Sequence, residues 1–209
     1  MNFIENQEWR YATKKFDATK KVSSTDLETI KKAIRLSTSS FGLQPYQVID
    51  VQNKEIRAQL LPVSWGQQQV VDASHLFVFA GLKTVDANYI KGFIKNMAET
   101  RSISEESISG YGDFMESKIA TLPEEYASVW TAKQCYLALA NLINVAAELK
   151  IDVTPMEGFE AEKYNEILGL DKHNLNAVLV ATIGYRHDED ATQHYKKVRK
   201  PESELFITL

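Results

Sequence analysis

The sequence has only one cysteine, Cys135, which excludes an intrachain disulfide and a metal site built from several cysteines. None of its four histidines pairs with another at HxxxH or HExxH spacing, which argues against a zinc site. Neither GxGxxG nor GxxxxGK[ST] occurs, so there is no motif for a Rossmann or P-loop nucleotide site. No serine has a nucleophile-elbow setting. An enzyme with this sequence would therefore depend on a bound organic cofactor.

Strong charge of one sign is lacking as well. The net charge of −4 favours neither nucleic acid nor an anionic membrane as a partner. The first ten residues, MNFIENQEWR, have no apolar segment of the kind a signal peptide needs and contain two glutamates. We therefore expect a cytoplasmic protein, and 209 residues with 44% apolar composition predict one globular domain.

The patterning predicts one domain with a mixed sheet between helices. Residues 46–51, 76–80 and 177–183 have the apolar content of strands. Thr25 and Glu28 have capping-box spacing before a helical stripe, residues 85–120 predict two helices, and Pro123 begins a long helix that reaches about Lys150. That long helix is apolar almost all round but contains Lys133 and other polar residues, so it predicts burial against the core or a second subunit rather than a membrane span.

Several polar segments are candidate binding sites, although each also has an ordinary structural interpretation. The basic residues in 10–16 and 196–200 are either solvated surface or an anion site built from both ends of the chain. Residues 37–40 (STSS) either end a helix or supply hydroxyl donors, and the glutamines of residues 66–69 suit the edge of a heterocyclic base. His75 and Cys135 are interpreted as structural. The final LFITL is apolar, so we expect it to dock on its own sheet or on a partner.

These segments together resemble the FMN-dependent nitroreductases, in the branch of the NAD(P)H-dependent oxygen-insensitive and dihydropteridine-reductase-like enzymes. In order along nearly the whole chain they are RYATKKF, STSSFGLQPYQV, GQQQVVDASHLFVF, WTAKQCYLALANLINVAAEL, VTPMEGF and KKVRKP. The resemblance implies an α+β nitroreductase fold with a central mixed sheet flanked by helices. It also implies an intertwined homodimer with noncovalent FMN at the subunit interface. Residues 1–209 would form the single domain, with 186–209 an extension that packs on the partner subunit.

The resemblance also implies roles for individual residues. Arg10, Lys197 and Arg199 would hold the FMN phosphate, and Lys14 would approach the flavin N1 and O2 edge. Tyr11 and Ala12 stand where relatives often have His and Ser, which leaves backbone or partial contacts. Gln69 would meet the pyrimidine edge, and Gly66 stands where relatives have Asn. The other implied cofactor residues are Thr38, Ser39 and Ser40 of the second subunit and Gln67.

Within residues 153–159 (VTPMEGF), residues 155–158 resemble the family turn that passes over one flavin face. Pro155 and Met156 would belong to this cofactor-binding turn, where Pro155 would stiffen the backbone and Gly158 would permit its close approach to the flavin. The backbone amides of Glu157 and Gly158 would point at flavin N5 and O4, and the Glu157 side chain would orient the turn or border the nicotinamide pocket. Without the other segments, an ordinary Pro/Gly turn would be an equally good interpretation.

The function implied is an NAD(P)H oxidoreductase without a metal. NADH or NADPH would give hydride to the flavin, and a nitroaromatic, a quinone or a related small acceptor would then be reduced in the same pocket, a ping-pong cycle. Phe41 and Phe114 are the candidate pocket walls. Two alternatives stay open, a specialised reductase on the same scaffold and a non-catalytic flavin-binding sensor or storage protein.

Overall fold

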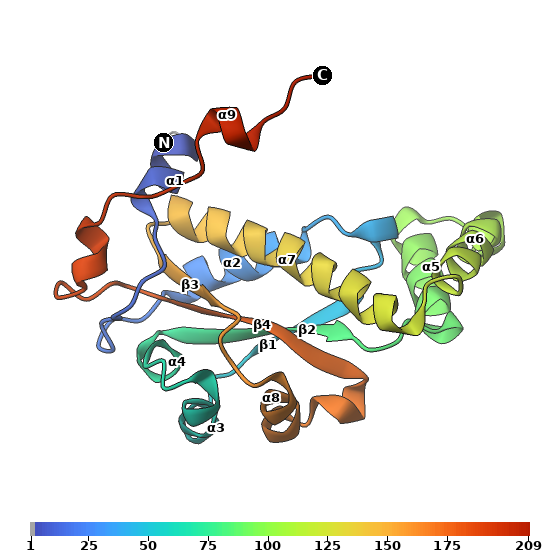
Figure 1. Ribbon diagram of the computed structural model, residues 1–209. Helices are drawn as coiled ribbons and strands as arrows, with labels where there is room; N and C mark the ends of the chain where they lie inside the picture. Colours follow the sequence, from blue (N-terminus) through green and yellow to red (C-terminus); the bar gives the residue numbers. More distant parts are fainter. Residues whose placement is uncertain (1–2) are drawn as a thin grey trace.

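A four-stranded sheet with the order β1-β2-β4-β3 forms the centre of the protein (Figure 1). The computed structural model describes residues 3–209. The strands are β1 (Tyr46–Asp50), β2 (His75–Leu82), β3 (Asp152–Met156) and β4 (Leu175–Gly184). All three strand pairings are antiparallel, and the one parallel contact is an isolated bridge between Ala12 and Val153. The expected α+β class is confirmed, whereas the expected mixture of strand directions is confined to that bridge.

Helices cover both faces of the sheet. One face packs against α2 (Ser24–Arg35) and α7 (Glu124–Glu148), and the other against α3 (Lys54–Leu60), α4 (Gln69–Asp72) and α8 (Ala161–Leu168) (Figure 1). Because successive strand residues point to opposite faces, Phe77 enters the first core and Leu76 and Val78 enter the second. This two-sided burial explains why β2 is a continuous apolar run.

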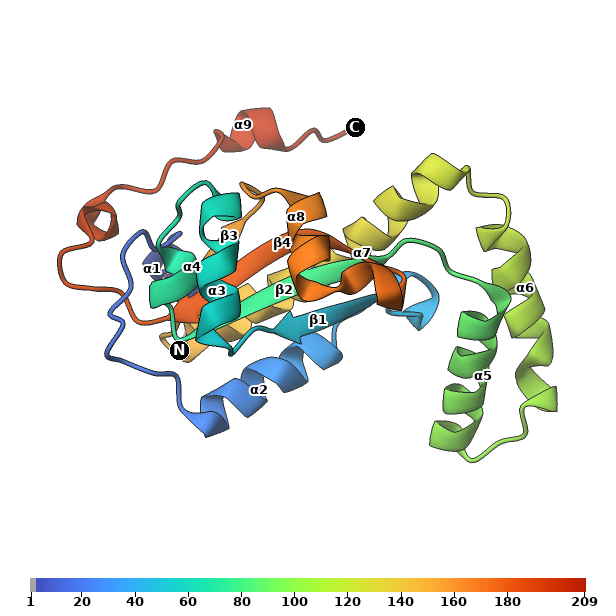
Figure 2. The ribbon, with the colours of Figure 1, turned by 90° about the horizontal axis from the view of Figure 1, so that it is seen from below.

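The remaining elements lie at the ends of this core. Helices α5 (Ala87–Arg101) and α6 (Ser109–Ile119) form a hairpin beyond the end of the sheet (Figure 2). Near the termini lie α1 (Phe3–Trp9) and α9 (Glu202–Leu205). The short 3₁₀ turns are η1 (Ser40–Gly42), η2 (Pro62–Ser64), η3 (Glu106–Ile108), η4 (Leu170–His173) and η5 (Ala191–His194).

Two local predictions were wrong. The cap of α2 is Ser23 rather than Thr25, because the Ser23 hydroxyl accepts the Asp26 amide and donates to the Asp26 carboxylate. Pro155 lies inside β3 rather than in a turn, opposite Ala181. β3 is an edge strand, where a residue without a backbone N–H is tolerated, so the chain turns only after Met156.

The long helix α7 is buried on one side only. Cys135, Ala138 and Leu142 pack into the core, whereas Val129 and Leu137 are exposed although they are apolar. None of the helices in residues 3–209 combines the length and the apolar character that crossing a lipid bilayer requires. Because Val129 and Leu137 are exposed, the outer side of α7 has apolar side chains that the described part of this chain does not cover.

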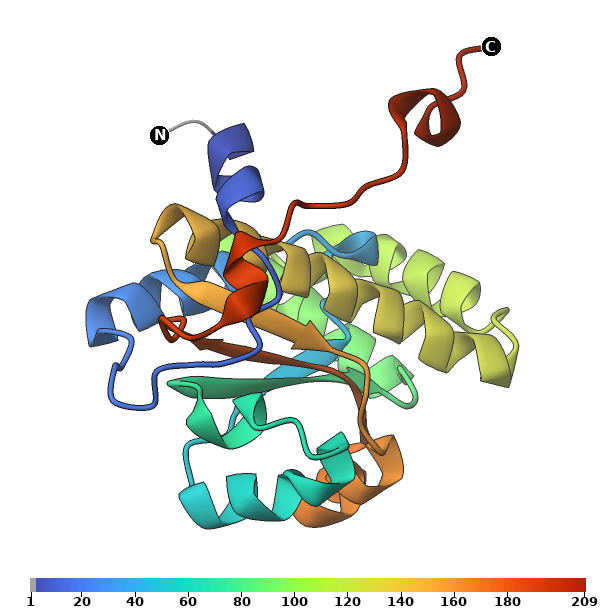
Figure 3. The same ribbon diagram turned by 60° about the vertical axis from the view of Figure 1, so that its left-hand side comes forward.

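The C-terminal segment stands away from the body of the protein (Figure 3). After β4 the chain passes α1, and its last residues run past α9 without reaching the sheet (Figures 1 and 3). Phe206 and Ile207 are 66% and 84% exposed. Of the two docking sites expected for the apolar end, its own sheet is thus excluded in this structure.

Candidate functional site

The loop of residues 10–15, called here the N-terminal loop, lies against the edge strand β3. Ala12 forms the parallel bridge to Val153, and the Thr154 hydroxyl donates a hydrogen bond to the Thr13 carbonyl oxygen. Phe16 then bridges Arg186 in antiparallel fashion, and the His187 amide donates to the Lys15 carbonyl oxygen. The loop is thereby fixed between β3 and the segment that follows β4.

Asp190 is the centre of these contacts, and its side chain is only 3% exposed. One carboxylate oxygen, Oδ2, accepts hydrogen bonds from the Tyr11 hydroxyl at 3.0 Å, the Lys14 amide at 2.7 Å and the Lys15 amide at 3.1 Å. The other, Oδ1, accepts from the Thr192 amide and hydroxyl at 3.0 and 2.6 Å. Burial of the carboxyl alone would raise its pKa, but the bonds from Thr192, Lys15 and Lys14 together lower that pKa to about 2.

This pKa predicts an acid-dependent part of the stability. The folded pKa of Asp190 lies below the ordinary aspartate value of 3.8, so its contribution is complete above about pH 4 and is lost as the pH falls toward 2. The shift corresponds to about 2 kcal/mol. In urea unfolding from pH 6 to pH 2.5, Asp190→Asn should therefore lose less stability on acidification than the wild type, whereas Asp188→Asn, at an exposed position, should follow the wild type. Equal pH dependence in all three proteins would contradict the assignment.

Arg186 fastens the start of the N-terminal loop. Its guanidinium lies 4.4 Å from the Trp9 ring centroid and 4.5 Å from that of Tyr11, so it is held between two aromatic rings. The same group donates to the buried carboxylate of Asp152 from Nε at 3.0 Å and Nη2 at 2.6 Å. The first residue of β3 and the loop therefore share one anchoring cation.

The predicted phosphate residues Arg10, Lys197 and Arg199, called here the basic cluster, line one cavity of about 360 Å³. Burial and then the charge of Arg199 lower the pKa of Arg10, and burial and then Arg10 and Arg199 lower the pKa of Lys197. No carboxylate among the described side chains forms an ion pair with these three residues. Glu8 also lines the cavity, and its charge raises the pKa of Lys197. Because the cations around the cavity outnumber this carboxylate, the cavity favours the binding of an anion.

The three cations have different freedom to bind a ligand. The Lys197 ammonium donates to the carbonyl oxygens of Gln7, Glu8 and Arg10 and so caps the end of α1. Arg10 uses Nε to bind the Gln7 side chain at 2.7 Å, and Arg199 uses Nη1 to bind the adjacent carbonyl of Val198. The terminal guanidinium nitrogens of Arg10 are therefore the donors best placed for an anion, with Lys197 as a fixed charge beside them.

The two neighbouring lysines of the loop differ in their partners. The Lys15 ammonium forms an ion pair with Glu189, which also lowers the pKa of that glutamate. The Lys14 ammonium is exposed and has no ion pair or hydrogen bond to any other residue in the described range. Of the two, only Lys14 has an uncommitted charge for a ligand.

The end of β3 presents the amides of Glu157 and Gly158. Neither amide donates a hydrogen bond to another residue within 3–209. The Glu157 carboxylate instead accepts the Tyr136 hydroxyl at 2.6 Å, and burial followed by this bond raises the pKa of Tyr136 to about 12. Two free amides with a fixed neighbouring side chain are donors available to a ligand.

Gly158 is also required by its neighbours. A Cβ atom at this position would lie 2.8 Å from two ring carbons of Trp65, and the Gln67 side chain donates to the Gly158 carbonyl at 2.8 Å. Trp65 itself has a left-handed backbone, with φ of 54°, and its ring is largely exposed. Such a conformation is costly for a bulky residue and is concentrated at functional sites. The buried side chain of Gln69 begins α4 nearby in the chain.

Residues 38–41 lie apart from this arrangement. The Ser40 amide donates to the Gln134 side chain on α7 at 2.8 Å, and the Gln44 amide donates to the Ser39 hydroxyl oxygen. α1, next to the basic cluster, instead binds α7 at Asn144, ten residues and therefore about 15 Å further along the helix. The predicted hydroxyl donors and the predicted phosphate residues consequently do not meet within one chain.

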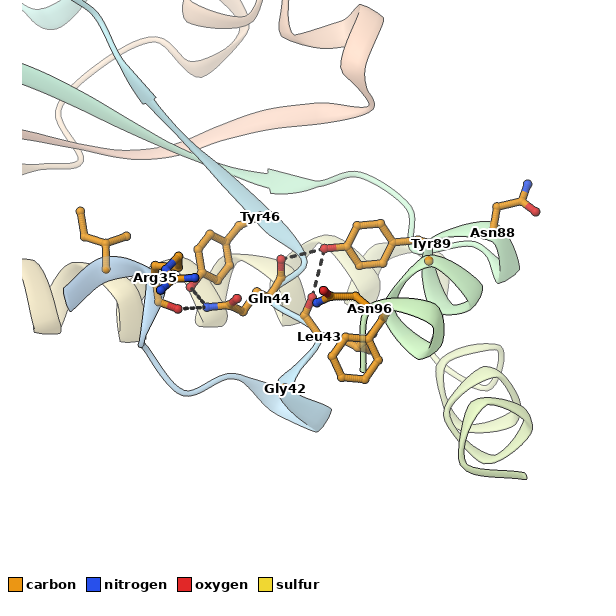
Figure 4. Close-up of a pocket in the computed structure, with 11 residues that line it drawn as sticks. Arg35, Gly42, Leu43, Gln44, Tyr46, Asn88, Tyr89 and Asn96 are labelled. Carbon is orange, nitrogen blue, oxygen red and sulfur yellow. Dashed lines mark hydrogen bonds between the residues drawn. The ribbon is translucent and has the colours of Figure 1, made fainter. Parts of the chain in front are cut away.

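A larger cavity, of about 610 Å³, lies between residues 42–46 and α5 (Figure 4). None of the predicted cofactor residues lines it. Two of its polar side chains are already bonded (Figure 4). The Tyr89 hydroxyl donates to the carbonyl oxygens of Leu43 and Gln44, and the Gln44 side chain donates to the carbonyl oxygen of Arg35. The volume of this cavity does not by itself indicate a ligand, so we assign it no role in the candidate site.

The two predicted pocket walls are in contact. The rings of Phe41 and Phe114 meet edge to face with centroids 6.3 Å apart, and the Lys118 ammonium lies 5.5 Å from the Phe114 ring. Phe41 also has a positive φ of 58°, which sets its ring at the rim of a cavity of about 600 Å³ beside α5. The two predicted pocket walls thus come from different elements, Phe41 from η1 and Phe114 from α6.

The family model that describes the nitroreductase family matches residues 8–185. The chain belongs to the nitroreductase family. A Staphylococcus epidermidis protein provisionally named NAD(P)H nitroreductase is 37% identical over 97% of this chain and 94% of that protein. As expected from the resemblance, the chain is thus a member of an oxidoreductase family.

Solved nitroreductase structures share the fold. A Bacillus subtilis protein superposes with a TM-score of 0.88 at 20% identity and covers 99% of this chain and 98% of that one. An Exiguobacterium sibiricum protein, solved in complex with FMN, gives a TM-score of 0.85 at 20% identity, with 100% and 98% covered. The nitroreductase fold is therefore confirmed for this chain.

Sequence reasoning missed four residues that shape the site, namely Asp190, Arg186, Trp65 and Tyr136. Asp190 carried a partial signal, because an acid two residues before Thr192 is typical of a side-chain cap, which it forms at η5. Its contacts with the N-terminal loop join residues more than 170 positions apart, so no local pattern could show them.

Proposed function

We propose that the protein is an FMN-dependent oxidoreductase that uses NADH or NADPH to reduce nitroaromatics, quinones or related small acceptors. The observation that carries the proposal is the donor set of one chain. It comprises a basic cluster that forms no ion pair, a lysine whose ammonium has no partner and two backbone amides that donate to no other residue, all counted within the described part of the chain and lying around the N-terminal loop and the end of β3. FMN has a dianionic phosphate, an N1–O2 edge that gains negative charge on reduction, and acceptor atoms at N5 and O4, so this donor set fits it.

The residues have distinct roles in this proposal. Arg10, Lys197 and Arg199 hold the phosphate, Lys14 stabilises negative charge at the N1–O2 edge, and the amides of Glu157 and Gly158 serve the N5 and O4 side. Gln69 meets the pyrimidine edge of the flavin. Gln67 acts beside it through its hydrogen bond to the Gly158 carbonyl oxygen. When bound, the noncovalent flavin supplies the hydride chemistry, and the protein supplies orientation and preorganised donors.

We also propose that the active unit is a homodimer in which the segment of residues 38–41 acts on the partner's site. The separation of this segment from the basic cluster supports the proposal, as do the exposed apolar side of α7 and the exposed apolar residues 205–209 at the C-terminal end. Interfaces formed by such obligate pairs bury about 2,000–5,000 Å².

Sedimentation tests this assembly. We expect a dimer at micromolar concentration, because the exposed apolar side chains on α7 and in residues 205–209 need a cover. Deletion of residues 202–209 should weaken the dimer and the bound FMN together. A folded, FMN-loaded monomer of the full chain would contradict the proposal.

Turnover distinguishes an oxidoreductase from a flavin-binding sensor or storage protein. The purified protein should oxidise NADH or NADPH with a nitroaromatic or quinone acceptor and give the parallel-line kinetics of a ping-pong cycle. A specialised reductase would turn over only one acceptor class in such a screen. Bound FMN that neither nucleotide reduces would refute the enzymatic proposal.

A further inference from the structure

The segment of residues 185–192, called here the clamp, holds the N-terminal loop and the residues that follow it. Besides the bonds of Asp190, the His187 amide donates to the Lys15 carbonyl oxygen and Glu189 pairs with the Lys15 ammonium. Just after the loop, the Asp17 amide donates to the Tyr185 carbonyl oxygen. None of the residues assigned to the cofactor lies in the clamp.

We propose that Asp190 is a positioning residue that holds the N-terminal loop in the shape required to present Arg10 and Lys14 to the anionic cofactor. A single oxygen, Oδ2, accepts the side chain of Tyr11 and the amides of Lys14 and Lys15. It therefore holds both ends of a five-residue stretch, residues 11–15, at one point. This inference rests on the proposed function for its ligand but not for the geometry of the clamp.

The charge of Asp190 suits this task for a physical reason. The loop carries the cations Arg10, Lys14 and Lys15 and adjoins Lys197 and Arg199, which repel one another. A buried carboxylate that accepts five hydrogen bonds gives these cations a fixed negative neighbour without occupying their side chains. Because Asp190 binds Lys14 through its amide, the Lys14 ammonium stays available.

The position of the carboxylate also explains why Lys14 and Lys15 differ. Their consecutive amides both face Oδ2 at 2.7 and 3.1 Å, and the Lys15 side chain continues to Glu189 on the clamp. Lys14 has no partner on the clamp for its side chain in the described part of the chain. The clamp thus commits one lysine to structure and leaves the other for the ligand.

The test compares Asp190→Ala with Asp188→Ala in the chain of residues 1–209. Asp188 is exposed, belongs to the same segment and loses the same charge, so it is a matched control. Amide hydrogen exchange at Lys14 and Lys15 should accelerate about 10- to 100-fold in Asp190→Ala, as expected when a hydrogen bond to a charged group is lost, and exchange in β2 and β4 should be unchanged. FMN dissociation constants, measured by quenching of FMN fluorescence, should rise about tenfold or more in Asp190→Ala and stay at the wild-type value in Asp188→Ala.

The isosteric variant Asp190→Asn serves if the alanine variant does not fold. It keeps an acceptor oxygen but removes the charge, so the exchange at Lys14 and Lys15 should accelerate by only about three- to tenfold. Unchanged exchange at these two amides in either variant would overturn the clamp. Faster exchange with unchanged FMN affinity would overturn its role in positioning. A wild-type protein that does not bind FMN would refute the proposed function instead, while the exchange comparison would still decide the geometry.

Discussion

Replacement of Lys14 by methionine is expected to slow the reduction of the bound flavin by NADH or NADPH about 10- to 100-fold. Lys14 places an unpaired ammonium on the N-terminal loop, and its interaction strengthens as the N1–O2 edge of the ligand becomes more negative. A hydrogen bond to a charged group is worth about 1.5–3 kcal/mol, and each 1.4 kcal/mol changes a rate about tenfold. Methionine keeps the length and apolar bulk of the side chain, so the loss reports on the charge.

Stopped-flow measurement of flavin absorbance provides the rate, and Lys15→Met is the control. Lys15 is already paired with Glu189, so its loss should change the rate little. The flavin midpoint potential should fall in Lys14→Met, and FMN affinity should fall less than in Arg199→Ala, which removes a proposed phosphate contact. Equal rates in the wild type and Lys14→Met, or a larger loss in Lys15→Met, would show that the wrong lysine is assigned.

Replacement of Arg57 by methionine should destabilise the fold by about 3 kcal/mol. The buried Arg57 guanidinium donates to the carbonyl oxygens of Val70 at 2.6 Å, Ala73 at 2.7 Å and Ser74 at 3.4 Å, which close the end of α4. Burial lowers its pKa, and it forms no ion pair within residues 3–209. Without Arg57, three carbonyl oxygens lose their donor, and each such group is costly to leave unpaired.

Thermal unfolding measures the effect of this substitution. For a domain of this size, the expected loss lowers Tm by about 6–12 °C. Arg35→Met is the matched control, because Arg35 is exposed and its side chain makes no hydrogen bond to the described residues. A Tm in Arg57→Met within about a degree of that of Arg35→Met would show that the three carbonyl bonds contribute nothing net.

Sequence patterning predicted well the elements in which buried apolar residues are continuous or recur at regular spacing. The apolar run of β2, the two-helix region after it and the long helix α7 were all predicted, because each has a continuous or periodic apolar pattern. β3 was missed because Pro155 argues against a strand, and only its edge position permits it. The cap of α2 was misplaced by two residues because Ser23 and Thr25 are both residue types that cap helices, and the spacing of Thr25 and Glu28 favoured Thr25.

From the sequence, the candidate site could be predicted only through its basic side chains and backbone amides. The resemblance named the basic cluster and the Glu157–Gly158 amides, and the structure places them around one loop and one strand end. The groups that shape this arrangement, Asp190 and Arg186, act through contacts between distant segments. Such contacts depend on the folded chain, and one sequence contains no periodic signal for them.

The absorbance spectrum of the purified protein shows most directly whether this chain holds FMN. We expect a yellow protein with flavin absorption, from which heat denaturation releases FMN at one molecule per chain. Protein isolated without cofactor should take up added FMN and quench its fluorescence. A colourless, folded protein that does not take up added FMN would show that the chain is not an FMN protein.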